Sequence, residues 1–187
     1  MAPGGPLTGE QQQALADAKE RARSFMGAAR VASFNVWSIG IFAALTILFG
    51  IFSLTALVLG IGLAVVTWNE YRGRARLRSF DPEGPRLLGR NQLGLMALIV
   101  VYALWSMFQA RAHPDPELAQ MDQILGGDTS GLVASLTTIV YIAVIAATGI
   151  FQGLMARYYF KRIPMVEDYV RDTESWVLDL QRAADLD

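Results

Sequence analysis

The chain has 187 residues, enough for one domain, and its 17 acidic and 16 basic side chains give a formal net charge of −1. This balance gives no indication of a nucleic-acid partner, and the absence of cysteine excludes disulfides, thiolate metal sites and cysteine nucleophiles in this chain. Hydrophobic residues make up 53% of the sequence, and they are concentrated in four blocks without any Asp, Glu, Lys or Arg.

The first 30 residues predict a polar tail and a helix ahead of the first apolar block. They lack the short apolar core and small-residue cleavage site of a signal peptide, so we expect an uncleaved anchor. Thr8 and Gln11 have the spacing of a capping box, in which each side chain bonds the backbone N–H of the other residue. We therefore predict a helix from about Glu10 to Arg30.

Four membrane spans are predicted, over residues 31–49, 51–68, 92–110 and 131–156. A single helix over the first two blocks would be about 57 Å long, which exceeds the roughly 30 Å thickness of a hydrocarbon core. We expect a tight helical hairpin that turns between Gly50 and Ser53, and the alternative is a hairpin that only dips into the membrane. The Pro- and Gly-containing segment from Asp81 to Pro85 predicts the turn before the third span.

Beyond the fourth span, Pro164 fits the first turn of a new helix, and the apolar spacing predicts one amphipathic helix of about 20 residues. Its apolar stripe follows heptad a and d positions and consists of Val166, Tyr169, Thr173, Trp176 and Leu180. The opposite face is acidic and would be repelled by an anionic membrane surface. The stripe should therefore pack on protein: the basic N-terminal helix, the arginine-rich loop, or a second copy of the chain.

Basic residues are distributed unevenly between the two sides of the predicted spans. Fifteen of the sixteen lie in the N-terminal segment, the loop between the second and third spans, or the C-terminal segment, and only Arg111 lies on the other side. The positive-inside rule makes the basic side cytoplasmic, so we predict a multi-pass protein of the cell (inner) membrane with both termini in the cytoplasm. The use of 14 Arg against 2 Lys favours a GC-rich bacterial genome.

The fourth span has an uncharged polar face, formed by Ser135, Thr138, Tyr141, Thr148 and Gln152. Such a face could line a water-filled path in an oligomer, or it could pack helices together in lipid. Gly149 and Gly153 in the same span form a GxxxG pattern, which permits close helix packing within the chain or between copies.

Polar and aromatic residues also mark the ends of the predicted spans. The amides near these boundaries, expected to cap helices or to bond between them, are Asn35, Asn69, Asn91, Gln92 and Gln109. Aromatic residues near span ends, including Trp68, Tyr158 and Tyr159, fit the interfacial belts of membrane proteins.

Two groups of charged or ionisable residues are candidate binding sites. The alternating arginines after the second span are expected either to contact lipid phosphates or only to fix topology, and they are Arg72, Arg74, Arg76 and Arg78. His113 is near Asp115 and Glu117, but one histidine with flexible carboxylates makes a poor cation site, so no metal is predicted.

The predicted fold is all-α, with a cytoplasmic tail and helix (1–30), a four-helix transmembrane domain (31–156) and a cytoplasmic amphipathic helix (157–187).

No span contains an ionisable group, which argues against secondary active transport and intramembrane proteolysis. No nucleophile–base pair or metal cage is recognisable, so neither an enzyme nor a cofactor is expected. The leading hypothesis is a homo-oligomeric passive ion channel in the lipid bilayer. The alternative is a non-catalytic scaffold or accessory subunit that binds a protein partner through its C-terminal helix.

Overall fold

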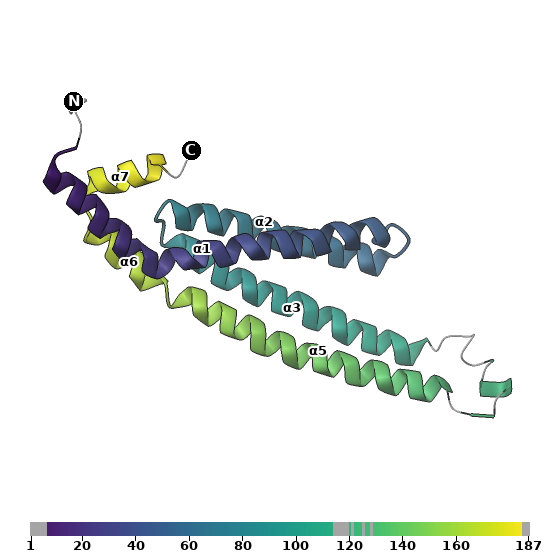
Figure 1. Ribbon diagram of the computed structural model, residues 1–187. Helices are drawn as coiled ribbons and strands as arrows, with labels where there is room; N and C mark the ends of the chain where they lie inside the picture. The colour runs from purple at the N-terminus through teal and green to yellow at the C-terminus, as the bar shows by residue number, and fades with distance from the viewer. Residues whose placement is uncertain (1–6, 114–119, 121, 125, 128, 185–187) are drawn as a thin grey trace.

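The computed structural model describes residues 7–113, 120, 122–124, 126–127 and 129–184, and within these residues it is all-helical, without strands. The helices are α1 (Gly9–Gly50), α2 (Leu54–Arg78), α3 (Glu83–Ala112), α5 (Thr129–Phe160), α6 (Ile163–Arg171) and α7 (Ser175–Ala184). Four of them are long and apolar enough to cross a membrane. The prediction of an all-α chain with four such helices is confirmed (Figure 1).

Helix α1 begins at the predicted capping box. The Thr8 backbone N–H donates to Gln11 Oε1 at 3.0 Å, and the Gln11 N–H donates to Thr8 Oγ1 at 3.3 Å. The helix then continues for 42 residues to Gly50, so the predicted N-terminal helix and the first span are one helix. The reason is that residues 9–50 contain no proline and no other strong stop signal.

The turn between α1 and α2 lies where the sequence predicts it. Helix α1 ends at Gly50, and α2 begins at Leu54 after Ser53, whose Oγ accepts a hydrogen bond from the Ala56 N–H at 3.4 Å. A Cβ on Gly50 would lie 2.8 Å from the Leu57 backbone nitrogen, so this tight approach requires glycine.

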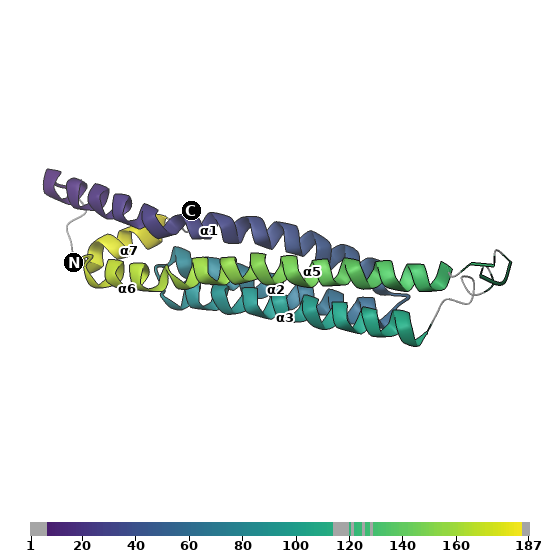
Figure 2. The same cartoon turned by 90° about the horizontal axis from the view of Figure 1, so that it is seen from below.

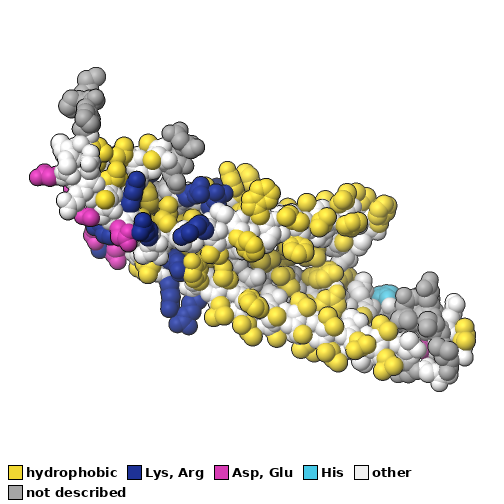
Figure 3. All heavy atoms as spheres, viewed as in Figure 1, with side chains coloured by type: hydrophobic (Ala, Val, Ile, Leu, Met, Phe, Trp, Pro, Cys, Tyr) yellow, Lys and Arg dark blue, Asp and Glu magenta, His cyan; other side chains and the backbone are white. Residues whose placement is uncertain are grey.

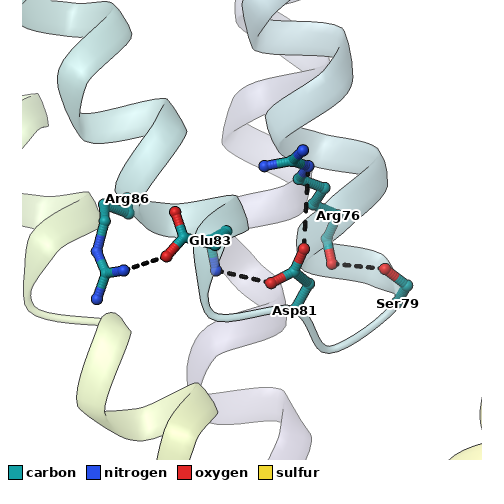
Figure 4. Close-up of polar contacts among 5 residues, drawn as sticks. All are labelled: Arg76, Ser79, Asp81, Glu83 and Arg86. Atoms are coloured by element: carbon teal, nitrogen blue, oxygen red, sulfur yellow. Dashed lines mark hydrogen bonds and ion pairs between the residues drawn. The ribbon is translucent and has the colours of Figure 1, made fainter.

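The turn between α2 and α3 is held by side chains of its own residues (Figure 4). Asp81 Oδ1 accepts from the Glu83 N–H at 2.9 Å, and Ser79 Oγ donates to the Arg76 carbonyl at 2.9 Å. Asp81 also pairs with Arg76, and Glu83 pairs with Arg86. These contacts fix the direction in which α3 leaves the turn.

The long helices pack mainly in chain order, with α1 on α2, α2 on α3 and α3 on α5. The α1–α2 and α3–α5 hairpins are closest near the α2–α3 turn and move apart toward residues 51–53 (Figure 1). We call the end with the α2–α3 turn the basic end. Helices α6 and α7 and the start of α1 lie beyond it (Figure 2). Where the hairpins diverge, apolar residues such as Val58 and Leu98 line a groove of about 280 Å³ between α2 and α3.

A buried core lies at this end of the molecule, in what we call the terminal module: residues 9–30 of α1, the turn at 79–82, α6 and α7. Phe25 of α1, Phe80 of the turn and Tyr169 of α6 contact one another, with ring centroids 5.2–6.3 Å apart. The Tyr169 hydroxyl donates to Gln181 Oε1 of α7 at 2.5 Å. Aromatic packing therefore joins segments from both ends of the chain.

The prediction of one continuous C-terminal helix is wrong, because α6 ends at Arg171 and α7 begins at Ser175. The break lets two short helices cover α1, which one straight helix could not do. Val166 and Tyr169 of α6 and Val177 of α7 thus enter the same core.

The predicted heptad stripe is divided by this break. Val166, Tyr169 and Thr173 are buried, Trp176 is partly buried, and Leu180 is 39% exposed. Thr173 lies in the break, and its Oγ1 accepts from Arg21 Nη2 of α1 at 3.4 Å. Much of the stripe therefore packs on the N-terminal helix, which was one of the three surfaces expected to receive it.

Replacing Phe25 with alanine should lower the free energy of unfolding of the terminal module by about 3–5 kcal/mol, because Phe25 is 0% exposed at the centre of this core. The matched control is Phe34→Ala on the same helix, since Phe34 is 70% exposed. Thermal unfolding in detergent, with limited proteolysis of α6 and α7, measures both. Equal losses in the two variants would contradict this description of the core.

Candidate functional site

Glu70 on α2 has a carboxylate that is 0% exposed. It lies two residues beyond Trp68, the predicted end of the second span, but α2 continues to Arg78 and therefore carries Glu70 into the helical bundle. The predicted span 51–68 itself contains no charged residue, but the helix that includes it is longer and carries an acidic side chain beyond the span. The hydropathy pattern ended the span at Trp68 because Asn69 and Glu70 are polar, although the helix does not end there.

Neutral donors from the other three long helices surround this carboxylate. Asn35 Nδ2 of α1 donates to Glu70 Oε1 at 2.9 Å, and Asn91 Nδ2 of α3 donates to Oε2 at 2.8 Å. Gln92 Nε2 lies 3.3 and 3.2 Å from the two oxygens, and the Tyr159 hydroxyl of α5 donates to Oε1 at 3.2 Å. We call these five residues the Glu70 cluster.

The cluster has the chemistry of an anion held by neutral groups. An ionised carboxylate only accepts hydrogen bonds, and all four partners direct N–H or O–H groups at it. Asn91 Nδ2 also donates to the Val66 carbonyl at 2.9 Å, which fixes the orientation of its amide. These bonds offset part of the large cost of burying the charge, and they depend on all four helices being in place.

The arrangement does not provide a set of metal ligands. The partner groups that reach Glu70 are donors, whereas a cation would need oxygen atoms directed toward it. Within the part of the chain that the structure describes, no group of three or more His, Cys, Asp or Glu side chains could hold a metal ion. The hydrogen bonds of the cluster join the four long helices at the basic end of the molecule.

Three of the five boundary amides bond between helices, as the sequence suggested: Asn35, Asn91 and Gln92. Asn69 and Gln109 take no part in the cluster. Tyr159, expected in an interfacial aromatic belt, is instead fully buried. Glu70 was missed because only the three-dimensional structure shows that these amides converge on it.

Part of the polar face of the fourth predicted span meets α3. The Tyr141 ring lies 6.2 Å from that of Tyr102, and Arg111 Nη2 donates to Thr138 Oγ1 at 3.4 Å. Ser135 is exposed, and the half-buried members of the face are Thr138, Tyr141, Thr148 and Gln152. This supports helix packing for Thr138 and Tyr141. By contrast, a Cβ on Gly149 or Gly153 would meet no atom of another described helix within 4 Å, so the GxxxG pattern makes no close helix contact in the described part of the chain.

The four arginines predicted to contact lipid lie in different surroundings. Arg72 is exposed, Arg74 and Arg78 are half-buried, and Arg76 pairs with Asp81 at 3.9 Å. In the other group, His113 follows the last residue of α3. Asp115 and Glu117 lie outside the described residues.

Searches against family models, curated proteins and solved structures give no match to this chain.

Replacing Glu70 with glutamine should lower the free energy of unfolding by about 1–3 kcal/mol, although the two side chains are nearly the same size. The new NH₂ group would face donors that are held in place from three other helices. The control is Glu20→Gln, because the Glu20 side chain is 69% exposed and its ion pair with Arg23 is on the surface. Denaturant or thermal unfolding in detergent compares the two, and a Glu70→Gln protein as stable as the parent would contradict the proposed bonding.

Proposed function

We propose that this chain is a four-span membrane protein that acts as a non-catalytic scaffold subunit and presents its terminal module to a partner in the cytoplasm. The surface of the long helices supports membrane insertion. Trp37, Phe49 and Phe151 are 75%, 72% and 67% exposed, and in each of the four long helices at most 17% of an apolar stretch of 18 residues is buried. Soluble monomers rarely expose continuous apolar surface on this scale, whereas a hydrocarbon environment accommodates it.

The charge distribution supports the proposed orientation. Lys and Arg side chains form a band between the apolar surface of the long helices and the outer part of the terminal module, where acidic side chains are visible (Figure 3). A basic band next to an apolar surface is typical of the cytoplasmic boundary of a membrane protein. The terminal module would then stand just outside the membrane, where soluble segments can reach it.

The scaffold proposal rests on one groove of the terminal module. Asp17 and Glu20 of α1 and Asp172 and Glu174 of the α6–α7 break line a groove of about 560 Å³, with Arg21 as its one basic residue among the lining side chains. Acidic residues from the two ends of the chain thus converge on a concave surface. The apolar stripe of α6 and α7 is largely covered by α1, which leaves this groove as the surface for a basic segment of a partner protein.

An oligolysine peptide tests the groove directly. The variant Asp17→Asn with Asp172→Asn should bind this peptide about fivefold more weakly than the parent protein, because exposed charges contribute modest energies that salt screens. Fluorescence anisotropy with the protein in nanodiscs measures the affinity, and added salt should reduce the difference.

The matched control changes the same charge outside the groove. Asp168→Asn with Asp179→Asn alters carboxylates that pair with Arg171 and Arg182 on the surface. If this control weakens peptide binding as much as the groove variant does, net charge accounts for the binding and the groove does not.

A homo-oligomeric passive channel is the second candidate. It is supported by the exposed outer face of α5 and by the open space at Gly149 and Gly153, which would let another copy approach closely. The scaffold proposal predicts that Thr138→Leu and Thr148→Leu leave ion flux into liposomes at background, as in the parent protein. Flux in the parent protein that these variants block, together with an oligomeric native mass in nanodiscs, would favour the channel.

A further inference from the structure

An apolar groove lies on the surface of the α1–α2 hairpin, and we call it the α1–α2 groove. It has a volume of about 420 Å³ and is lined by residues of α1 between Val36 and Ile47 and by residues of α2 between Ala64 and Tyr71. Ala43 is buried in its floor, whereas Ala64 and Tyr71 are exposed, so the groove opens at the surface of the molecule. In the proposed membrane orientation, this surface faces lipid.

The walls of the groove are made by small side chains of both helices. Gly40 and three alanines leave space there. A Cβ on Gly40 would lie 3.3 Å from Thr67 Cγ2, so the methyl group of Thr67 faces α1 at this level. The Thr67 hydroxyl donates to the Leu63 carbonyl at 2.8 Å and offers no free donor to the groove. A hydrocarbon chain can therefore fill this space without leaving a polar group unpaired.

The length of the groove matches one leaflet of a bilayer. The α-helical rise from Val36 to Ile47 is about 16 Å, and half of a roughly 30 Å hydrocarbon core is about 15 Å. The groove begins beside the Glu70 cluster, because Val36 follows Asn35, and it extends toward the turn at 51–53. It therefore has room along its length for one acyl chain of the cytoplasmic leaflet.

Aromatic and basic side chains lie where the groove reaches the basic end. The rings of Trp68 and Tyr71 are stacked, with centroids 5.9 Å apart, and both side chains are exposed. Such residues are typical of the interface between hydrocarbon and headgroups. Arg72 lies one helical turn beyond Trp68 on the same face of α2. It is exposed and forms no ion pair with another described residue. The groove thus leads from an apolar wall to an available cation, which is complementary to an anionic phospholipid.

We propose that the α1–α2 groove binds one acyl chain of an anionic phospholipid of the cytoplasmic leaflet, while Arg72 binds its headgroup phosphate. A guanidinium group recognises phosphate through charge-assisted hydrogen bonds. A second copy of the chain in the same membrane orientation fits less well, because its own basic residues would lie at the level of Arg72 and repel it. This inference rests on the proposed membrane insertion and is independent of the scaffold role.

Native mass spectrometry tests both parts of the site with protein released from nanodiscs of phosphatidylcholine and phosphatidylglycerol. Ala64→Phe should reduce the retention of both lipids about tenfold, because the new ring would occupy the groove. Ala44→Phe on the opposite wall should have the same effect. Arg72→Gln should lower the ratio of retained phosphatidylglycerol to phosphatidylcholine about tenfold, as expected for the loss of a charge-assisted bond.

Two matched controls place the same changes on α5, away from the groove. Ala147→Phe and Arg157→Gln alter exposed residues and should retain both lipids as the parent protein does. Thermal unfolding in detergent should be the same for Ala64→Phe and Ala147→Phe, since both alanines are exposed. This comparison separates a filled groove from a misfolded protein.

The alternative results separate the possible failures. Equal lipid retention in the parent, Ala64→Phe and Ala44→Phe proteins would overturn the groove site. An equal loss in Arg72→Gln and Arg157→Gln would overturn the role of Arg72 and assign the preference to the whole basic band. A dimeric native mass that Ala64→Phe converts to a monomer would assign the groove to a second copy. Failure of the parent protein to enter nanodiscs would instead overturn the membrane insertion on which the proposed function depends.

Discussion

The carboxylate of Glu70 is the constraint on which the arrangement of the long helices depends. Once buried, it requires several donors at fixed positions, and they come from α1, α3 and α5. Outside this level the hairpins diverge, and α5 packs mainly on α3. The cluster thus supplies directional bonding among helices whose apolar surfaces would provide little specificity in a hydrocarbon environment.

The position of Tyr159 links this constraint to the terminal module. Its hydroxyl donates to Glu70, while its ring belongs to the same buried core as Phe25 and Tyr169. Helix α6 begins only four residues later, at Ile163. Because α5 is fixed by the cluster, the start of α6 is also fixed, and the aromatic contacts with α1 and the α2–α3 turn then place the rest of the module. Burial of one carboxyl group and packing of aromatic rings therefore act on the same segment of chain.

Local patterns in the sequence predicted the elements that depend on local interactions. The capping box at Thr8 and the hairpin turn after Gly50 need only neighbouring residues, and both are confirmed. The Glu70 cluster joins residues up to 124 positions apart in the sequence, as in the contact between Asn35 and Tyr159. No local sequence pattern indicates that residues so far apart are in contact. The break at 172–174 was missed because the apolar spacing continues through Thr173, although the fold of α6 and α7 over α1 requires a change of direction there.

For the arginines, the number on each side of the predicted spans and the contacts of each side chain give different information. The uneven distribution of basic residues predicts the orientation of the chain in a membrane, whatever each side chain contacts. The reason is that the positive-inside rule concerns the transfer of charge across a membrane. A binding role depends on which donors remain unsatisfied after folding. Arg76 lies between Arg74 and Arg78 in the sequence, yet its pairing with Asp81 engages it in the turn. Arg162 lies 88 residues after Arg74, yet shares with it an unpartnered buried Nε. Tertiary contacts, and not the alternating pattern, thus separate an arginine that pairs with a carboxylate from those whose Nε has no partner within the described residues.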